Sequence, residues 1–114
     1  MRNKVGHAGV YGLRVTIITL AELKYGAYNS QKVSENLENI DKFLRKVKVL
    51  PLDHDAAERF GKIKTDLRRS GQTIQDFDIL IASITLVHGG VLVTNNVKHF
   101  KRIPELTYES WLQE

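Results

Sequence analysis

The stretch TIQDFDILIASITLVHGGVLVTNN, residues 73–96, decides the fold class. It is almost wholly apolar after Asp78 and then reaches Gly89 and Gly90, which predicts a largely buried helix closed by a turn. The apolar run VLV follows and predicts a buried strand, after which the polar residues TNN begin. A buried helix that leads directly into a buried strand is typical of α/β proteins.

The segments before and after this stretch alternate in the same way. Strands are predicted in residues 14–18 (RVTII), in VKVLPLD and, at an edge, in LTYESWL. A short helix is predicted from Leu20 to about Tyr28, and two further helices carry apolar stripes: Val33, Leu37, Ile40, Leu44 and Val47 in the first, and Ala56, Phe60, Ile63 and Leu67 in the second. The alternation, without a hairpin signal, predicts an α/β sandwich with a mostly parallel sheet.

Composition narrows the class of protein. The 114 residues predict a single domain over the whole chain, 1–114, with 42% hydrophobic residues to fill its core. The absence of cysteine excludes disulfides and thiolate zinc sites, and no apolar run is long enough to span a membrane, so we expect a cytoplasmic protein. The formal charge of +4 favours an anionic partner, with nucleic acid as the first candidate.

Two helix starts carry acids that have two possible roles. Ligand chemistry in parallel sheets gathers beyond the carboxyl ends of the strands, which here places it after Ile18, Leu52 and Val93. Glu22 follows Thr19 in a T-x-x-E pattern, so it is either a capping-box residue or part of a metal site.

The second of these helix starts holds two acids. Asp76 repeats the capping pattern with Thr73, and we interpret it mainly as a cap. Asp78 opens a helix that must be largely buried, so its carboxylate needs a partner, which the helix N-terminus or a bound cation would supply. Asp53 is suited to cap the helix that follows it, and Gly71 to end that helix.

Polar and basic side chains follow the predicted central strand. Thr94, Asn95 and Asn96 form either a plain turn or a source of oxygen ligands. The basic run from Lys98 to Arg102 is a solvated surface unless a phosphate backbone arrives at the strand end. The four histidines lack zinc-site spacing and are interpreted as surface or capping residues.

Taken together, these segments resemble the PIN-domain family and, within it, the VapC-type toxins of type II toxin–antitoxin systems. The resemblance runs from about Arg14 to Trp111 and rests on the order of four motifs: TIITLAELKYG, IQDFDILIASITLVHGGVLVTNN, VTNNVKHFKRIPEL and YESW. In these motifs Glu22 matches the internal glutamate of the family, and Asp78 matches its helix-opening aspartate. Thr94, Asn96 and Phe100 match the T-x-[ND]-x-x-x-F ending.

The resemblance implies a PIN-like three-layer sandwich and an endoribonuclease that hydrolyses RNA with Mg²⁺ or Mn²⁺ held by acidic residues. It implies catalytic roles for Glu22, Asp78 and Asn96, with Glu22 and Asp78 as metal ligands and Thr94 and Asp76 in support. The RNA-binding residues would be Lys98, Lys101 and Arg102. The implied partners are an RNA substrate, a cognate antitoxin and a second copy of the chain, without a membrane.

One family motif has no counterpart in this sequence. Family members begin with a strand ending in an L-D-T-N type motif, whereas the first aspartate here is Asp41, inside a predicted helix. The resemblance therefore implies that the first central strand is missing, because the true start lies upstream, because the chain is a degenerate remnant, or because another chain supplies the strand. The alternative function is accordingly an inactive, truncated PIN-like module that binds an antitoxin or self-associates.

Overall fold

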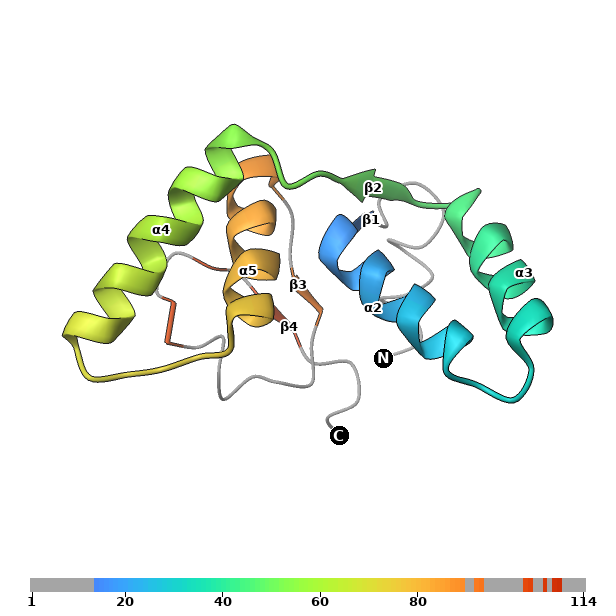
Figure 1. Ribbon diagram of the computed structural model, residues 1–114. Helices are drawn as coiled ribbons and strands as arrows, with labels where there is room; N and C mark the ends of the chain where they lie inside the picture. The colour runs from blue at the N-terminus through green and yellow to red at the C-terminus, as the bar shows by residue number, and fades with distance from the viewer. Residues whose placement is uncertain (1–13, 90–91, 94–101, 104–105, 107, 110–114) are drawn as a thin grey trace. The chain divides into compact units, whose positions relative to one another are not determined.

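The computed structural model describes residues 14–89, 92–93, 102–103, 106 and 108–109. The chain separates into two compact units, Met1–Leu50 and Pro51–Glu114, and each unit contains two helices and one pair of strands among its described residues (Figure 1). That residues 1–114 form a single domain stays a prediction. In the described part of the chain, no helix is long and apolar enough to cross a membrane.

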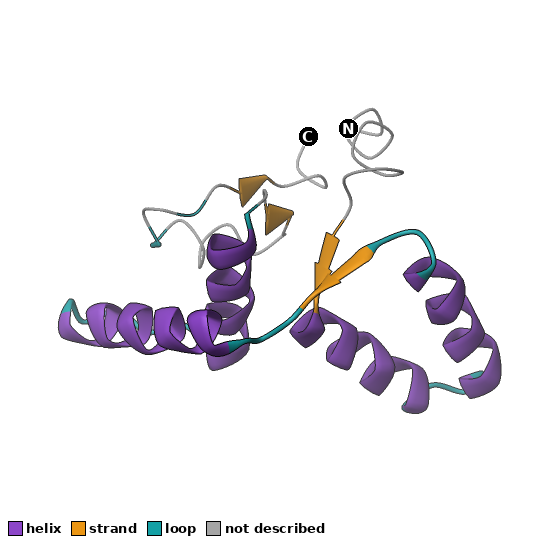
Figure 2. Ribbon diagram, turned by 90° about the horizontal axis from the view of Figure 1, so that it is seen from above, coloured by secondary structure: helices purple, strands orange, loops and turns teal. Residues whose placement is uncertain are grey.

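The first unit is built from β1 (Arg14–Thr16), α2 (Ile17–Tyr28), α3 (Val33–Leu44) and β2 (Lys48–Leu50). The two strands pair in parallel, with Arg14 opposite Lys48 and Thr16 opposite Leu50. Figure 2 draws the strands in orange. A parallel pair needs a long crossover connection, and here two helices supply it. The parallel arrangement predicted from the sequence is thus found in this unit.

Helix α2 begins three residues earlier than the sequence predicted. Ile17 and Ile18 were expected in the strand but form the first turn of the helix. Thr16 is the N-cap, and its hydroxyl oxygen accepts a hydrogen bond from the N–H of Thr19 at 3.1 Å. This bond satisfies one of the first-turn donors, so the cap outweighs the weak strand preference of two β-branched residues.

Helix α3 carries the predicted stripe, but the stripe is only half covered. Val33, Leu37, Ile40 and Leu44 are all half-buried, no residue of α3 is fully buried, and Val47 lies beyond the end of the helix. The turn before α3 is held by Ser30, whose hydroxyl donates to the carbonyl of Ala27 at 2.6 Å and accepts from the Asn36 amide at 2.9 Å.

The second unit is built from α4 (His54–Arg69), α5 (Asp76–His88), β3 (Leu92–Val93) and β4 (Tyr108–Glu109). Strands β3 and β4 are again parallel, with Leu92 opposite Tyr108 and Val93 opposite Glu109. The strand predicted in VLVTNN and the final strand predicted in LTYESWL are therefore both present. Each is two residues long among the described residues.

The two ends of α4 follow the sequence prediction. Asp53 is the N-cap, and its carboxylate accepts a hydrogen bond from the N–H of Ala56 at 3.0 Å. Gly71 follows the C-cap with φ at 75°, which glycine adopts without steric cost. The N–H of Gln72 then donates to the carbonyl of Leu67 at 2.8 Å, which completes a Schellman motif and satisfies a terminal carbonyl.

The core of the second unit lies between α4, α5 and the segment near residue 103. Its buried side chains are Ile63, Leu67, Ile79, Ala82, Ile103 and Leu106, with Phe60, Ile74 and Leu86 packed against them. The prediction of a buried α5 is confirmed, because most of the helix from Ile79 to Thr85 is buried. Its two buried hydroxyls, on Ser83 and Thr85, donate to the carbonyls of Ile79 and Ile81, so neither is left unsatisfied.

Candidate active site

Glu22 is not a capping residue. Because α2 begins at Ile17, Glu22 is the sixth residue of the helix, whereas a capping-box glutamate occupies the third position. The third position is occupied by Thr19, which makes two hydrogen bonds with Thr16. The backbone N–H of Thr19 donates to the Thr16 hydroxyl oxygen, and the Thr16 hydroxyl donates to the Thr19 hydroxyl oxygen at 3.2 Å. The interpretation of Thr19 and Glu22 as a capping box is therefore wrong. The Glu22 side chain is exposed on the helix surface.

Asp76 does not form the predicted cap with Thr73. The N-cap of α5 is Gln75, which makes no side-chain capping bond, and Asp76 is the first residue of the helix. Its carboxylate is instead paired with Lys64 of α4, with Nζ at 2.9 Å from Oδ1 and at 3.2 Å from Oδ2. Both side chains are about half exposed, so this bridge contributes little stability, but it commits the carboxylate to a partner.

Asp78 lies in the first turn of α5 and is half-buried. The residues after it enter the core, beginning with Ile79, which is 1% exposed. The first turn of a helix carries backbone N–H groups without intrahelical partners, and it favours a negative side chain. Asp78 therefore combines a setting suited to an anionic side chain with partial access to solvent.

The residues predicted after the central strand are described only in part. Thr94, Asn96, Lys98 and Lys101 lie outside the described residues. Arg102 is described and half-buried, and its Nη1 donates to the carbonyl of Thr73 at 3.0 Å. Arg102 is thereby attached to the loop that leads into α5, three residues before the helix begins.

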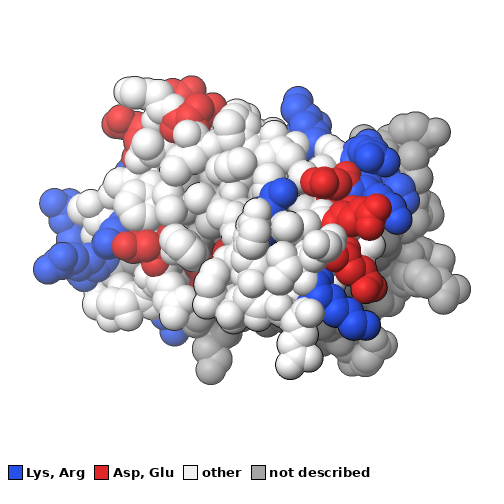
Figure 3. All heavy atoms as spheres, turned by 45° about the vertical axis from the view of Figure 1, so that its right-hand side comes forward, with Lys and Arg blue, Asp and Glu red and all other residues white. Residues whose placement is uncertain are grey.

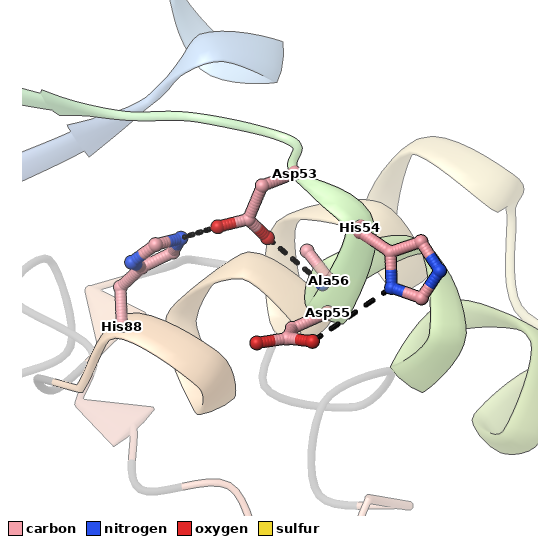
Figure 4. Close-up of polar contacts among 5 residues, drawn as sticks. All are labelled: Asp53, His54, Asp55, Ala56 and His88. Carbon is pink, nitrogen blue, oxygen red and sulfur yellow. Dashed lines mark hydrogen bonds and ion pairs between the residues drawn. The ribbon is translucent and has the colours of Figure 1, made fainter.

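Asp53 and His88 form a polar contact that the sequence reasoning missed. Nε2 of His88, in the last turn of α5, lies 3.0 Å from Oδ2 of Asp53, while Oδ1 of Asp53 caps α4 through Ala56 (Figure 4). His54 lies apart from this pair and approaches Asp55 at 3.8 Å. The sequence identified Asp53 as a cap, but nothing in the spacing connected it to His88, because the packing of α4 on α5 brings them together.

The charge of Asp53 is favoured by these contacts. The pKa of its carboxyl is lowered below the ordinary value, chiefly because the N–H of Ala56 donates to the charged form. The charge of His88 acts in the same direction, and partial burial acts against both. The pair joins the start of α4 to the end of α5, so we interpret it as a structural contact rather than a catalytic one.

Comparison with known proteins places this geometry in a family. Residues 3–106 match the family model of the PIN domain. The chain belongs to the PIN-domain family. The α/β architecture with parallel strand pairs, predicted from the sequence and found in both units, is the PIN-like fold that this family shares.

Relatives of this PIN domain include several VapC proteins. It is 37% identical over 99 residues to "Ribonuclease VapC2" of Rickettsia felis, which covers 87% of this chain and 74% of that protein. It is 38% identical over 97 residues to "tRNA(fMet)-specific endonuclease VapC" of Shigella flexneri, with 85% and 74% covered.

Solved structures similar to this PIN domain include complexes named VapBC. The DNA-bound VapBC of Salmonella typhimurium matches with a TM-score of 0.89 and 34% identity, covering 96% of this chain and 83% of that chain. VapBC2 of Rickettsia felis, bound to a promoter DNA fragment, matches with a TM-score of 0.88 and 34% identity, covering 96% and 84%.

The donor chemistry of this PIN domain suits a hard divalent cation. Glu22 is an exposed residue and Asp78 a half-buried one, each carries a carboxylate, and Mg²⁺ prefers oxygen ligands. Among the described residues, no group of three or more His, Asp or Glu side chains is gathered at one place. That Glu22, Asp78 and Asn96 share one ion stays a prediction, since the two acids belong to different units and Asn96 is not described.

Proposed function

We propose that this chain is a VapC-type toxin, a metal-dependent endoribonuclease that hydrolyses RNA phosphodiester bonds and is paired with an antitoxin. The observation that carries the proposal is the likeness to VapC ribonucleases over most of the chain. The position of Asp78, half-buried in the first turn of a buried helix, supports it from the structure.

The proposed ligands are the carboxylates of Glu22 and Asp78, with the side-chain oxygen of Asn96 as a further contact. A bound Mg²⁺ or Mn²⁺ would neutralise charge that develops on the phosphate and lower the pKa of a coordinated water. Asp78 lies in the first turn of α5, and this turn would orient its carboxylate. Glu22, free of any capping role, presents its carboxylate from the surface of α2.

Asp76 and Thr94 have supporting roles in this proposal. The Lys64 bridge joins Asp76 to α4, two residues before Asp78 in the first turn of α5. Asp76 would support the site by orienting this turn, because a ligand set acts only when its members are held in place. Thr94 follows Val93, the last described residue of β3, in the sequence, and parallel sheets gather ligand chemistry beyond the ends of their strands.

Lys98, Lys101 and Arg102 are the proposed contacts to the RNA backbone. Arg102 is the one whose position is described, and its bond to the Thr73 carbonyl places a guanidinium beside the loop before α5. A guanidinium carries five N–H donors, so a bond from Nη1 to a carbonyl leaves donors suited to a phosphate. Such contacts position the RNA without reading its sequence.

The proposed protein partners are a cognate antitoxin and a second copy of the chain. The similar solved structures are VapBC complexes, which supports the first. The stripe of α3, whose apolar side chains are half-buried and none fully buried, offers a surface to an amphipathic helix. An inactive module that only binds such partners is the alternative, favoured by the same incompletely covered surface.

The decisive experiment is RNA cleavage with Mn²⁺ by the 114-residue chain and by its Asp78→Asn variant. We expect the variant to lose at least about a hundredfold in rate, since even residues that only orient metal ligands cost ten- to a hundredfold. Asp55→Asn is the matched control, because Asp55 lies in the first turn of α4 and has no proposed ligand role. Equal cleavage by the unmodified chain and Asp78→Asn would refute the assignment of Asp78.

A thermal titration separates the two candidate functions without relying on cleavage. An ion that binds only the folded chain raises its melting temperature as the concentration of Mn²⁺ rises. The enzyme hypothesis predicts a rise that Asp78→Asn abolishes and Asp55→Asn keeps. No rise, together with no cleavage and a stable complex with an antitoxin, would instead identify the binding module.

A further inference from the structure

Two tyrosines on α2 are exposed to an extent unusual for aromatic side chains. Tyr25 is 70% exposed and Tyr28 is 66% exposed. They are three residues apart on one helix, so their side chains are neighbours on its surface. Large rings that remain in water when the chain folds are a feature of binding surfaces, where they supply contact area at a low cost in conformational entropy.

Tyr25, the first residue of the tyrosine pair, lies near Glu22 on the surface of α2, whereas Tyr28 is six residues from Glu22 and lies farther round the helix. Glu22 precedes Tyr25 by three residues, which puts the two side chains about one helical turn apart, with Cβ atoms roughly 5–6 Å from each other. Leu23, the other large exposed side chain in the middle of the helix, is two residues from Tyr25 and therefore faces a different direction.

The helix backbone is open at Gly26. Gly26 follows Tyr25 and lies four residues after Glu22, and a Cβ built on it would meet no atom within 4 Å. A glycine inside a helix costs stability, roughly 0.5–1 kcal/mol relative to alanine. Here it leaves the backbone accessible one turn after Glu22, where an extended chain could approach closely.

The net positive charge of the protein lies in residues 1–50, the unit that contains α2. Residues 1–50 hold nine Lys and Arg against four Asp and Glu, a formal charge of +5, whereas residues 51–114 hold eight against nine, a formal charge of −1. On the face shown in Figure 3, charges of both signs are interspersed, and the described residues form no continuous basic patch there. Long-range attraction can therefore bring a polyanion to the first unit, but close contact requires something besides charge.

We propose that Tyr25 and Tyr28 form a stacking platform for the bases of single-stranded RNA, with Tyr25 about one helical turn from Glu22. The proposal rests on the proposed ribonuclease function and adds the form of substrate and the residues that hold it. Exposed aromatic rings are a usual means of binding unpaired bases, because every base has a flat face that can stack, and the net positive charge of residues 1–50 attracts the polyanion. Stacked bases beside Glu22 would hold an extended strand next to a proposed metal ligand, so the platform favours single-stranded over duplex RNA.

The test measures RNA binding apart from cleavage. The full chain carrying Asp78→Asn is titrated against a fluorescein-labelled single-stranded RNA of about ten nucleotides, within the range that single-strand sites cover. Tyr25→Ala and Tyr28→Ala are each expected to weaken binding at least about fivefold, from a stacking contribution of roughly 1–3 kcal/mol per base. Tyr25→Phe and Tyr28→Phe keep the ring and should bind within about twofold of the parent.

Two controls make the result specific to stacking. Leu23→Ala removes another exposed large side chain of α2, one that faces away from Tyr25, and should leave the affinity for RNA unchanged. An oligonucleotide of the same length with abasic positions keeps the phosphates but lacks the bases, so the tyrosine and alanine forms should bind it equally. Alanine variants that bind the intact RNA as tightly as the parent overturn the proposal.

Cleavage by the chain without Asp78→Asn distinguishes a failure of this inference from a failure of the proposed function. If that chain cuts RNA and the alanine variants bind and cut equally well, the stacking platform is wrong while the ribonuclease stands. If no RNA is cut but binding still depends on the rings, the platform stands and the ribonuclease is wrong. If the alanine variants lose binding to an antitoxin peptide and not to RNA, the tyrosines belong to a protein interface and the proposal is wrong.

Discussion

Helices α2 and α5 are both rich in apolar residues, but α5 is largely buried and α2 is largely exposed. Both are rich in apolar residues on every side rather than along one stripe. In α5 the residues from Ile79 to Thr85 are almost all buried, whereas in α2 Ala27 alone is fully buried among the described residues. Four large side chains of α2 remain exposed: Ile17, Leu23, Tyr25 and Tyr28.

The difference shows that apolar composition does not decide what covers a helix. Helix α5 packs against α4 and the segment around Ile103 in one core, which accounts for its burial. Helix α2 packs in its own unit against α3 and the β1–β2 pair, and these leave much of its surface in water. We therefore interpret α5 as the structural helix of the fold and α2 as a helix that serves an interaction.

The largest effect that tests this comparison is on stability. Ile79→Ala, in the buried part of α5, should lower the free energy of unfolding by about 2–5 kcal/mol, because it removes transfer energy and leaves a cavity. Leu23→Ala on α2 should cost less than about 1 kcal/mol, since Leu23 is already 40% exposed. Urea denaturation of both variants measures the two changes, and equal losses would contradict the distinction between the helices.

A smaller effect compares the two helix starts. Thr16→Ala removes the capping acceptor of α2 and should lower the free energy of unfolding by about 1–2 kcal/mol, whereas Thr16→Ser keeps a hydroxyl and should largely preserve it. Gln75→Ala should change the free energy of unfolding little, because Gln75 makes no side-chain capping bond.

Glu22→Gln should also change the free energy of unfolding by no more than about 0.5 kcal/mol, as expected for an exposed residue without a capping role. A loss of about 1 kcal/mol in Glu22→Gln would restore the capping interpretation.

A glycine substitution sharpens the comparison with a gain of stability. Gly26→Ala should raise the free energy of unfolding by about 0.5–1 kcal/mol, since the added Cβ meets no neighbour within 4 Å and alanine favours the helix. Gly89→Ala, at the end of α5, should do the opposite, because Gly89 has φ at 83° and a Cβ is strained there. Thermal unfolding measures both signs, and a destabilising Gly26→Ala would mean that α2 is more closely covered than the structure shows.

The smallest expected effect concerns the contact that holds the end of α5 to the start of α4. The pKa of Asp53 is lowered in the folded chain, so its charge adds stability above the unfolded pKa, and this stability is lost as the pH falls through the folded value. Asp53→Asn keeps a capping oxygen but removes the charge. The variant should therefore be less stable than the parent at pH 7, and the difference should shrink below about pH 4. A difference that does not change with pH in urea denaturation would show that the charge is unimportant.

Much of the fold could be predicted because the signals are local. The cap at Asp53, the turn at Gly71 and the final strand each depend on a few neighbouring residues. The start of α2 was misplaced because Thr16 and Thr19 are both good caps and are separated by one turn. Geometry at Thr16 decided between them, and with that choice Glu22 lost its capping role.

The candidate site divides in the same way. Glu22, Asp78 and Asn96 were named from motif order, and their assembly around one ion stays a prediction. The attachment of Asp76 to Lys64 and of Arg102 to Thr73 could not be predicted, because each contact joins residues distant in sequence. The pair of Asp53 and His88 is of the same kind, since it exists only where the end of one helix meets the start of another.

By itself, the sequence determined the alternation of helices and strands and the buried character of α5, because periodicity and turn residues act over a few positions. The parallel sense of the strand pairs followed from that alternation, since a helix between two strands supplies the crossover that a parallel pair needs. Tertiary structure alone decided which apolar helix is covered and which stays in water. That outcome depends on which surfaces the rest of the chain brings to each helix, and no local pattern encodes it. Tyr25 and Tyr28 could thus be recognised as exposed only in the folded chain.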